Sequence, residues 1–295
     1  MTIQASSISP SINPPPTVEA ETESVQLPNG DWVVANATRL WLHQAPMAGL
    51  APLTEALTEP SEPDRTRQLL AGVLTSALRQ RSREQAAPRS ERETSWRHHL
   101  WSLASSYQTT HATPATMRRV AGRFETEGRP QLADYCRQVA DEESGHDELA
   151  LRDLRAMGLQ AEALVAAVQP PNAVALVALF RRLAEGPEPI AVLGYAYVLE
   201  RMALFSTAEY VQAIEAALPP GVKATRCLRV HSAVGTDQRH VRESLEFIAN
   251  LPAQDRRAIF QAAFESALLM AMPSDYPGGE AIDALVTRFR VASSD

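Results

Sequence analysis

Apolar residues recur at helical spacing along most of the chain, and proline or glycine separates one run from the next. Residues 64–82 are the clearest case, because Leu70, Leu74 and Leu78 fall on one side of a helix. Further helices are expected over residues 37–58 (one or two short ones), 91–110, 114–127, 131–157 and 223–250, from Pro171, from Pro187 through Glu200 toward residue 217, and from Pro252. Long helices with short connections predict an all-α helical bundle.

The N-terminal part of the chain follows a different pattern. Residues 1–25 are polar and rich in proline and serine, so we expect a disordered leader there. The one strand candidate is DWVVA at 31–35, just after the turn-like pair Asn29-Gly30. We therefore expect three parts: the leader, a helical N-terminal extension over 26–90, and a bundle over 91–295 that carries the functional residues.

Composition excludes several classes of function. The net charge is −7 and the basic residues are scattered, which argues against a nucleic-acid partner. The longest apolar stretch, residues 189–199, is shorter than the roughly 18 residues of a membrane span, so no membrane partner is expected. Cys136 and Cys227 form no Cys-x-x-Cys pair, which favours a reducing compartment and two buried apolar side chains. We expect a cytoplasmic protein that acts on a small molecule, with a homodimer left open.

Two carboxylate-x-x-histidine pairs carry the strongest chemical signal. Glu143 and His146 lie three residues apart in a predicted helix, and so do Asp237 and His240 in another. This spacing puts both side chains of a pair on one helix face, where both can reach one metal ion. One such pair is common in solvated acidic helices, but two on separate helices are less expected by chance. His231 stands shortly before the second pair.

Glu200 is a third candidate, because it follows one of the most apolar stretches of the chain, GYAYVL. Burial of a carboxylate is costly unless it is paired or binds a metal. The alternatives are a salt bridge to a neighbouring arginine, or a helix face that reaches solvent. Helical di-iron proteins take one Glu from each of two helices and Glu-x-x-His from two others, so three of four contributions are accounted for.

The fourth contribution should come from a helix before residue 130, where the sequence offers no clear choice. The candidates are Glu91, Glu93, His98, His99 and His111, and none of them stands inside a clean apolar pattern. Carboxylates and imidazoles together suit iron or manganese better than a structural zinc, which prefers thiolates.

The string EESGHDELALRDLRAMG, the glutamate in YAYVLE and the late His…Asp-x-x-His cluster resemble the heme-oxygenase-like di-metal oxidases and oxygenases. The resemblance covers roughly residues 95–250. It implies a heme-oxygenase-like bundle, two Fe(II) ions per chain and dioxygen as co-substrate. Known activities of that family are N-oxygenation, oxidative C–C cleavage and desaturation-type chemistry on amino acids and fatty acids. The metal ligands it implies are Glu143, His146, Glu200, His231, Asp237 and His240.

The chain departs from that family's pattern at two places. His231 precedes Asp237 by six residues where the family has four, so a regular helix would turn His231 about 120° away from Asp237. A bulge or unwinding at Gly235 would realign the histidine; otherwise it only neighbours the ligands. The early glutamate is also missing, and Glu142 or His111 are its possible replacements.

These features lead to one main hypothesis and two alternatives. The main one is a non-haem di-iron oxidase or oxygenase acting on a small molecule of amino acid, amine or fatty acid type, in specialised metabolism. The first alternative is a metal-free, thiaminase-like enzyme or binding protein of the same fold, with Cys136 ten residues before His146. The second is a ferritin-like metal-binding helical protein.

Overall fold

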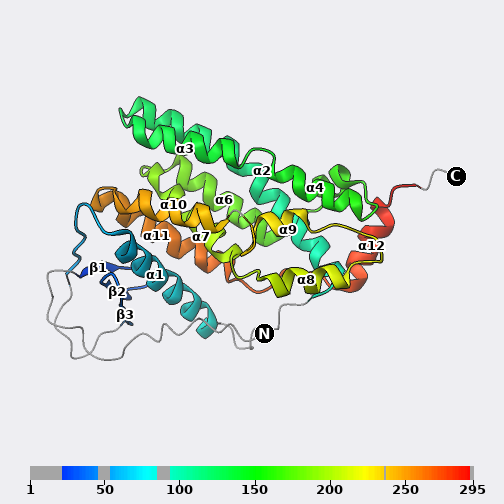
Figure 1. The fold of residues 1–295 in the computed structure, drawn as a ribbon, viewed down its shortest axis with the longest axis horizontal. Helices are drawn as coiled ribbons and strands as arrows, with labels where there is room; N and C mark the ends of the chain where they lie inside the picture. The colour runs from blue at the N-terminus through cyan, green and yellow to red at the C-terminus, as the bar shows by residue number, and fades with distance from the viewer. Residues whose placement is uncertain (1–21, 46–53, 85–93, 236, 293–295) are drawn as a thin grey trace. The chain divides into compact units, whose positions relative to one another are not determined.

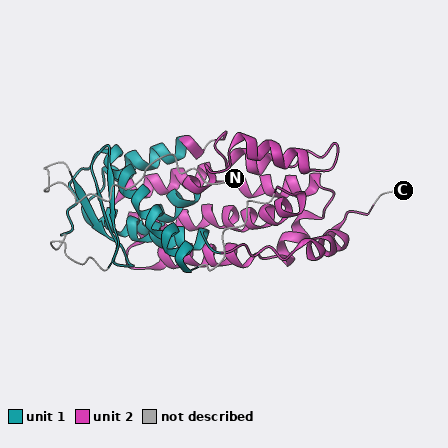
Figure 2. Ribbon diagram, turned by 90° about the horizontal axis from the view of Figure 1, so that it is seen from below, with its two compact units in different colours: residues 1–91, 190–199, 239–272 teal, residues 92–189, 200–238, 273–295 magenta. Residues whose placement is uncertain are grey.

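The computed structural model describes residues 22–45, 54–84, 94–235 and 237–292. The chain divides into two compact units, which Figure 2 shows in separate colours. Unit 1 comprises residues 1–91, 190–199 and 239–272, and unit 2 comprises residues 92–189, 200–238 and 273–295.

Unit 1 begins with a three-stranded antiparallel sheet of order β1-β2-β3, with β1 at Glu23–Gln26, β2 at Trp32–Ala35 and β3 at Leu40–His43. Helix α1 (Pro63–Glu84) packs on the sheet and on α11 (Ala253–Met270) (Figure 1). Gly72 allows this contact, because a Cβ there would lie 2.4 Å from Cγ1 of Val33.

The sheet corrects two of the sequence-based expectations. Residues 40–43 form a strand where short helices were predicted over 37–58, and residues 46–53 of that range lie outside the described residues. β1 begins at Glu23, inside the predicted leader, of which residues 1–21 also lie outside the described residues. Four-residue strands are too short to show a clear alternation, so β1 and β3 left little signal. The strand candidate at 31–35 and the helix at 64–82 are confirmed as β2 and α1.

Unit 2 is built around the long helix α2 (Trp96–Thr126). It contacts α3 (Pro130–Glu142), α4 (His146–Ala156), α5 (Ala161–Ala167), α6 (Pro171–Glu185), α8 (Ala208–Ala217) and α12 (Gly279–Phe289). The short helix α9 (Arg226–Val230) packs against α4 (Figure 1). A buried apolar cluster fills the space among α2, α4, α5, α9 and α12, with Leu100, Leu154 and Ile282 fully buried.

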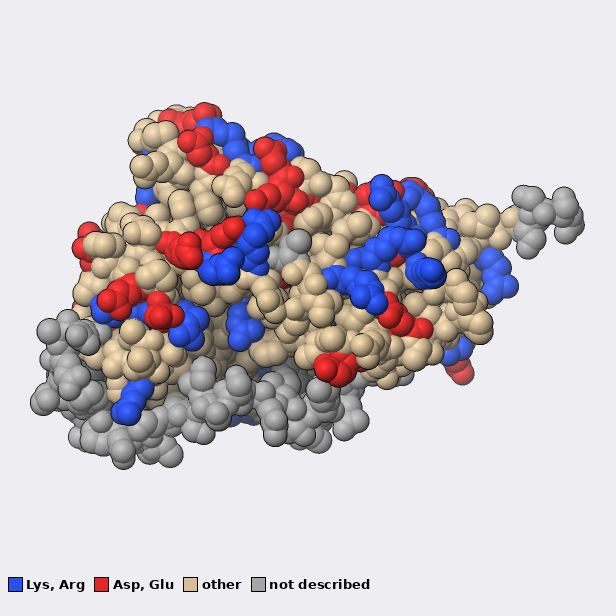
Figure 3. Space-filling model, viewed as in Figure 1, with Lys and Arg blue, Asp and Glu red and all other residues tan. Residues whose placement is uncertain are grey.

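Helices α7 (Val192–Ala203) and α10 (Asp237–Ala249) each contribute residues to both units. Among the described residues, no single helix has both the length and the apolar character to cross a membrane. Two bent helix pairs, residues 161–185 and 189–217, pass that test jointly on length and composition. Acidic and basic side chains lie intermingled on the face drawn in Figure 3.

Four predicted helix boundaries differ in the structure. Helix α2 continues through Pro114, where a new helix was expected, because its packing along α3, α4 and α6 outweighs the local cost of proline. The predicted helix 131–157 is broken between α3 and α4, the helix expected as far as 217 is broken between α7 and α8, and the helix 223–250 is broken between α9 and α10. Two of these breaks fall at the candidate ligands.

Candidate metal centre

Glu143 and His146 lie on either side of a helix break. Glu143 caps the C-terminus of α3 and His146 is the first residue of α4. Gly145 separates the helices with φ +87°, a left-handed conformation that side chains with a Cβ rarely adopt. The prediction that one continuous helix carries the pair is therefore wrong. The two side chains still meet, with Nδ1 of His146 at 3.0 Å from Oε2 of Glu143.

The segment before α10 brings His231 to Asp237. His231 caps the C-terminus of α9, residues 232–235 are not helical, and α10 begins at Asp237. Only glycine fits this turn at position 235, because a Cβ on Gly235 would lie 1.9 Å from the carbonyl oxygen of Val230. Nδ1 of His231 consequently lies 3.4 Å from Oδ1 of Asp237. The unwinding that the six-residue spacing required is present.

Three ligand atoms converge between these helix ends. One ligand atom each from Glu143, His146 and His231 lies within 4.8 Å of the others. The imidazole rings of His146 and His231 meet edge to face, with centroids 4.9 Å apart. Carboxylate oxygens of Glu143 and Glu200 also lie within 4.8 Å of each other. Glu200, on α7, therefore lies close to Glu143, which belongs to the predicted pair Glu143 and His146.

The cluster holds buried polar atoms without hydrogen-bond partners. Asp237 is 1% exposed, and among the described residues neither of its carboxylate oxygens has a hydrogen-bond partner. Nε2 of His231 is equally unsatisfied within the described part of the chain. Such atoms cost free energy when buried unless they have a ligand of their own. The donor set therefore fits a bound iron ion, which carboxylates and imidazoles favour.

The electrostatics agree with this fit. The hydrogen bond that His146 donates to Glu143 raises the pKa of His146 above its ordinary value, and the charges of Glu143 and Asp237 act in the same direction. A cation that replaced the proton on His146 would meet the same two carboxylates.

His240 lies one turn after Asp237 on α10 and is buried. Nη2 of Arg239 donates to its Nε2 over 3.0 Å. Asp237 and His240 thus lie three residues apart on one helix, as the sequence predicted.

The early-helix candidates lie elsewhere. His111 is 62% exposed, with Nδ1 at 2.7 Å from Oδ2 of Asp147. Buried His99 donates to the carbonyl of Ala224 over 2.6 Å, and His98 stacks on Tyr276. Glu142 accepts from Gln138 one turn earlier. Glu91 and Glu93 lie outside the described residues. From Trp96 to Phe124, helix α2 contains no acidic residue, so it supplies no carboxylate to the cluster.

Sequence reasoning missed the break at Gly145 and the burial of Asp153 in α4. The pair Ser144-Gly145 was the available signal, since Ser-Gly pairs mark turns. Asp153 gave a weaker signal: a carboxylate between Ala150 and Leu154, two positions that the helical pattern buries.

Comparisons with known proteins identify the family and the fold of the chain. Residues 100–271 match the model of a family described as "Iron-containing redox enzyme". No curated protein matches the chain. Among solved structures, a domain of unknown function with a heme oxygenase-like fold from Shewanella denitrificans is similar, with TM-score 0.51 and 18% identity, over 76% of this chain and 89% of that one. A TenA homolog from Pseudomonas syringae pv. tomato has TM-score 0.52 and 15% identity, over 80% and 99%. The fold is therefore the expected heme-oxygenase-like bundle.

Proposed function

The chain belongs to the family of iron-containing redox enzymes, and from this premise we propose that it is a non-haem iron oxidoreductase. It uses dioxygen as co-substrate and acts on a small molecule of amino acid, amine or fatty acid type. The observation that carries the proposal is the convergence of Glu143, His146 and His231 beside the unsatisfied carboxylate of Asp237.

We assign the first iron to Glu143, His146 and His231. Glu143 is placed to serve two ions, because its carboxylate approaches Glu200 as well as His146. Asp237, Glu200 and His240 complete the proposed set, the last on its register one turn after Asp237. Bound iron would supply dioxygen binding and electron transfer, as in other helical carboxylate proteins.

The chain's own residues do the remaining work. The carboxylates offset the charge of the metal in a setting where an uncompensated ion is costly. The helix ends at Gly145 and Gly235 hold the donor side chains at fixed backbone positions. Burial of Asp237 keeps bulk water from its carboxylate.

The thiaminase-like alternative loses support at Cys136. This residue is fully buried on α3, and burial raises the pKa of its thiol to about 12. A thiol in that state supplies almost no thiolate at neutral pH, so it is a poor nucleophile. A ferritin-like store remains distinguishable by experiment, because it would bind iron without coupling oxygen consumption to a small molecule.

The test is anaerobic titration of the metal-free full chain with Fe(II), followed by measurement of bound iron. We expect about two irons per chain, the number typical of this class of site. Glu143→Ala should lose most of both, since its carboxylate serves both positions. His111→Ala is the matched control and should bind iron like the wild type.

Two further results decide the assignment. If His231→Ala binds one iron per chain, His231 is a ligand. If it binds two, His231 only neighbours the ligands. No iron in the wild type would overturn the proposal. If the protein binds its full complement of iron but consumes no oxygen with a panel of amines, amino acids and fatty acids, it is a metal store and not an oxidoreductase.

A further inference from the structure

We propose that Asp153 is a positioning residue for the metal centre: its carboxylate anchors helix α9 and thereby holds His231 among the donors. The inference rests on the proposed function, in which His231 binds iron.

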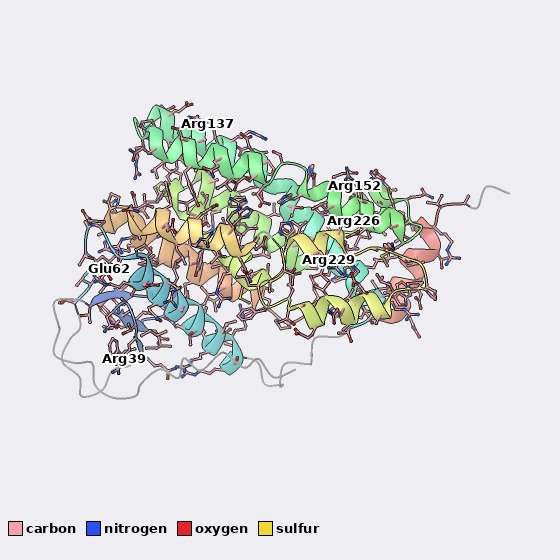
Figure 4. The ribbon with its side chains drawn as sticks, viewed as in Figure 1. Arg39, Glu62, Arg137, Arg152, Arg226 and Arg229 are labelled. Atoms are coloured by element: carbon pink, nitrogen blue, oxygen red, sulfur yellow. The ribbon has the colours of Figure 1, made fainter. Side chains whose placement is uncertain are left out.

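Asp153 projects from α4 and is fully buried. Its Oδ2 accepts a hydrogen bond from the backbone N–H of Cys227 over 2.8 Å. Its Oδ1 accepts one from Nη1 of Arg226 over 3.2 Å. Figure 4 labels Arg226 on α9, beside α4. Both oxygens of Asp153 are thus engaged by α9, so Asp153 is an anchor and not a further metal donor.

Asp153 caps the N-terminus of α9, because the N-cap residue of α9 does not. The N-cap residue of α9 is Thr225, whose side chain makes no capping hydrogen bond and instead donates to Oε1 of Glu215 over 2.7 Å. The N–H groups at a helix start need an acceptor, and the Asp153 carboxylate supplies it. With only five residues, α9 is too short to be stable without such contacts.

The anchor connects directly to His231. The backbone of Cys227 makes both contacts: its N–H donates to Asp153, and its carbonyl oxygen accepts from the N–H of His231 over 3.0 Å. On the facing helix, Asp153 follows His146 by seven residues, which is two turns or roughly 10 Å along one face of α4. The two helices are therefore joined twice, by Asp153 to Cys227 at one end and by the rings of His146 and His231 at the other.

A second buried side chain supports the same segment. His99 on α2 donates from Nε2 to the carbonyl of Ala224 over 2.6 Å. This bond fixes the residue before the N-cap, while Asp153 fixes the first turn. Removal of Asp153 should therefore loosen α9 without releasing the segment that leads into it.

The experiment compares Asp153→Ala, Asp153→Asn, His231→Ala and the double variant Asp153→Ala/His231→Ala, all in the full chain. Apparent affinity for Fe(II) is measured anaerobically, and amide hydrogen exchange is followed at residues 226–230 and over the rest of unit 2. Asp134→Ala is the matched control, since it removes an exposed aspartate of α3 that pairs with Arg137.

We expect Asp153→Ala to weaken iron binding by about 10–100-fold, the range for residues that orient ligands, and Asp153→Asn to weaken it less because an amide oxygen can still accept from Cys227. The double variant should bind no worse than His231→Ala, because the anchor acts through that histidine. Exchange over α9 should rise in Asp153→Ala and stay unchanged in Asp134→Ala.

The positioning role would be overturned if the losses of iron affinity in Asp153→Ala and His231→Ala added fully in the double variant, or if a folded Asp153→Ala bound iron like the wild type. Either result would leave the proposed function intact. A wild type that binds no iron would overturn the proposed function, and this role with it. If Asp153→Ala unfolds, a loss of iron affinity caused by unfolding is recognised by increased hydrogen exchange throughout unit 2. The iron affinity of Asp153→Asn then decides the test.

Discussion

Two buried polar clusters in this chain differ in how they are satisfied. In unit 1, Glu23 and Arg256 are both fully buried and form an ion pair at 2.9 Å. Each carboxylate oxygen of Glu23 has a partner, and the backbone N–H of Thr58 adds a hydrogen bond at 2.9 Å. In unit 2, Asp237 is buried to the same degree, but its oxygens have no hydrogen-bond partner within the described residues.

We interpret the first cluster as structural and the second as part of the proposed metal centre. Removal of a buried, fully paired carboxylate leaves the partner's charge uncompensated, and this destabilises the fold. A buried carboxylate with open acceptors costs stability until a ligand binds. The predictions below test that contrast, beginning with the largest effect.

The largest effect should follow Glu23→Ala. It leaves the guanidinium of Arg256 buried and unpaired, so the free energy of unfolding should fall by about 3–5 kcal/mol. Urea denaturation measures it. The double variant Glu23→Leu/Arg256→Met should recover part of the loss, because no charge remains buried. A loss below about 1 kcal/mol would show that the pair does not stabilise the fold.

The same prediction revises the N-terminal boundary. Removal of residues 1–25 would delete Glu23 and most of β1, although composition alone suggested a dispensable leader. A truncation from residue 22 keeps both, and we expect it to retain the stability of the full chain.

Asp237→Asn should have the opposite pattern to Glu23→Ala: a small change in stability and a large loss of iron affinity. The free energy of unfolding of the metal-free protein should change by less than about 1 kcal/mol, since a lost helix N-terminal charge is offset by relief from burial. Iron affinity should fall by more than about 100-fold, beyond the range for outer positions. A large loss of metal-free stability would place Asp237 with Glu23 as a structural group.

Gly145→Ala should have a smaller effect. The left-handed conformation costs a residue with a Cβ about 1–2 kcal/mol, and relief of that strain would shift Glu143 relative to His146. Gly128→Ala is the matched control, because Gly128 also has positive φ and a Cβ on either glycine would meet no other atom within 4 Å. Both variants should lose similar stability by urea denaturation, and Gly145→Ala alone should lose iron affinity.

The smallest effect concerns pH. Burial on its own would raise the pKa of Glu23, but the hydrogen bonds from Arg256 and Thr58 and the charge of Arg256 outweigh it, so the pKa lies below the ordinary 4.5. The stabilisation is therefore present above pH 4.5 and is lost as the pH falls through the lowered pKa. Between pH 7 and pH 3, the free energy of unfolding measured by urea denaturation should fall more steeply in the wild type than in Glu23→Gln. Parallel curves would contradict this.

The sequence by itself determined the fold class and the positions of several helices, and it indicated an iron-containing protein. Helical periodicity and proline or glycine boundaries are local signals, so α1, α6 and α11 could be predicted from them. The order of carboxylate and histidine residues also follows from the chain alone, and it indicated iron before any geometry was known.

Tertiary structure decided how those residues meet. The breaks at Gly145 and Gly235 replace two continuous helices, and neither break follows from periodicity, which continues across a single glycine. Asp153 gained its role only because α9 packs on α4, a contact between segments over 70 residues apart. Pairing of short strands and anchoring of a five-residue helix depend on such distant partners, because neither element is stable on its own local preferences.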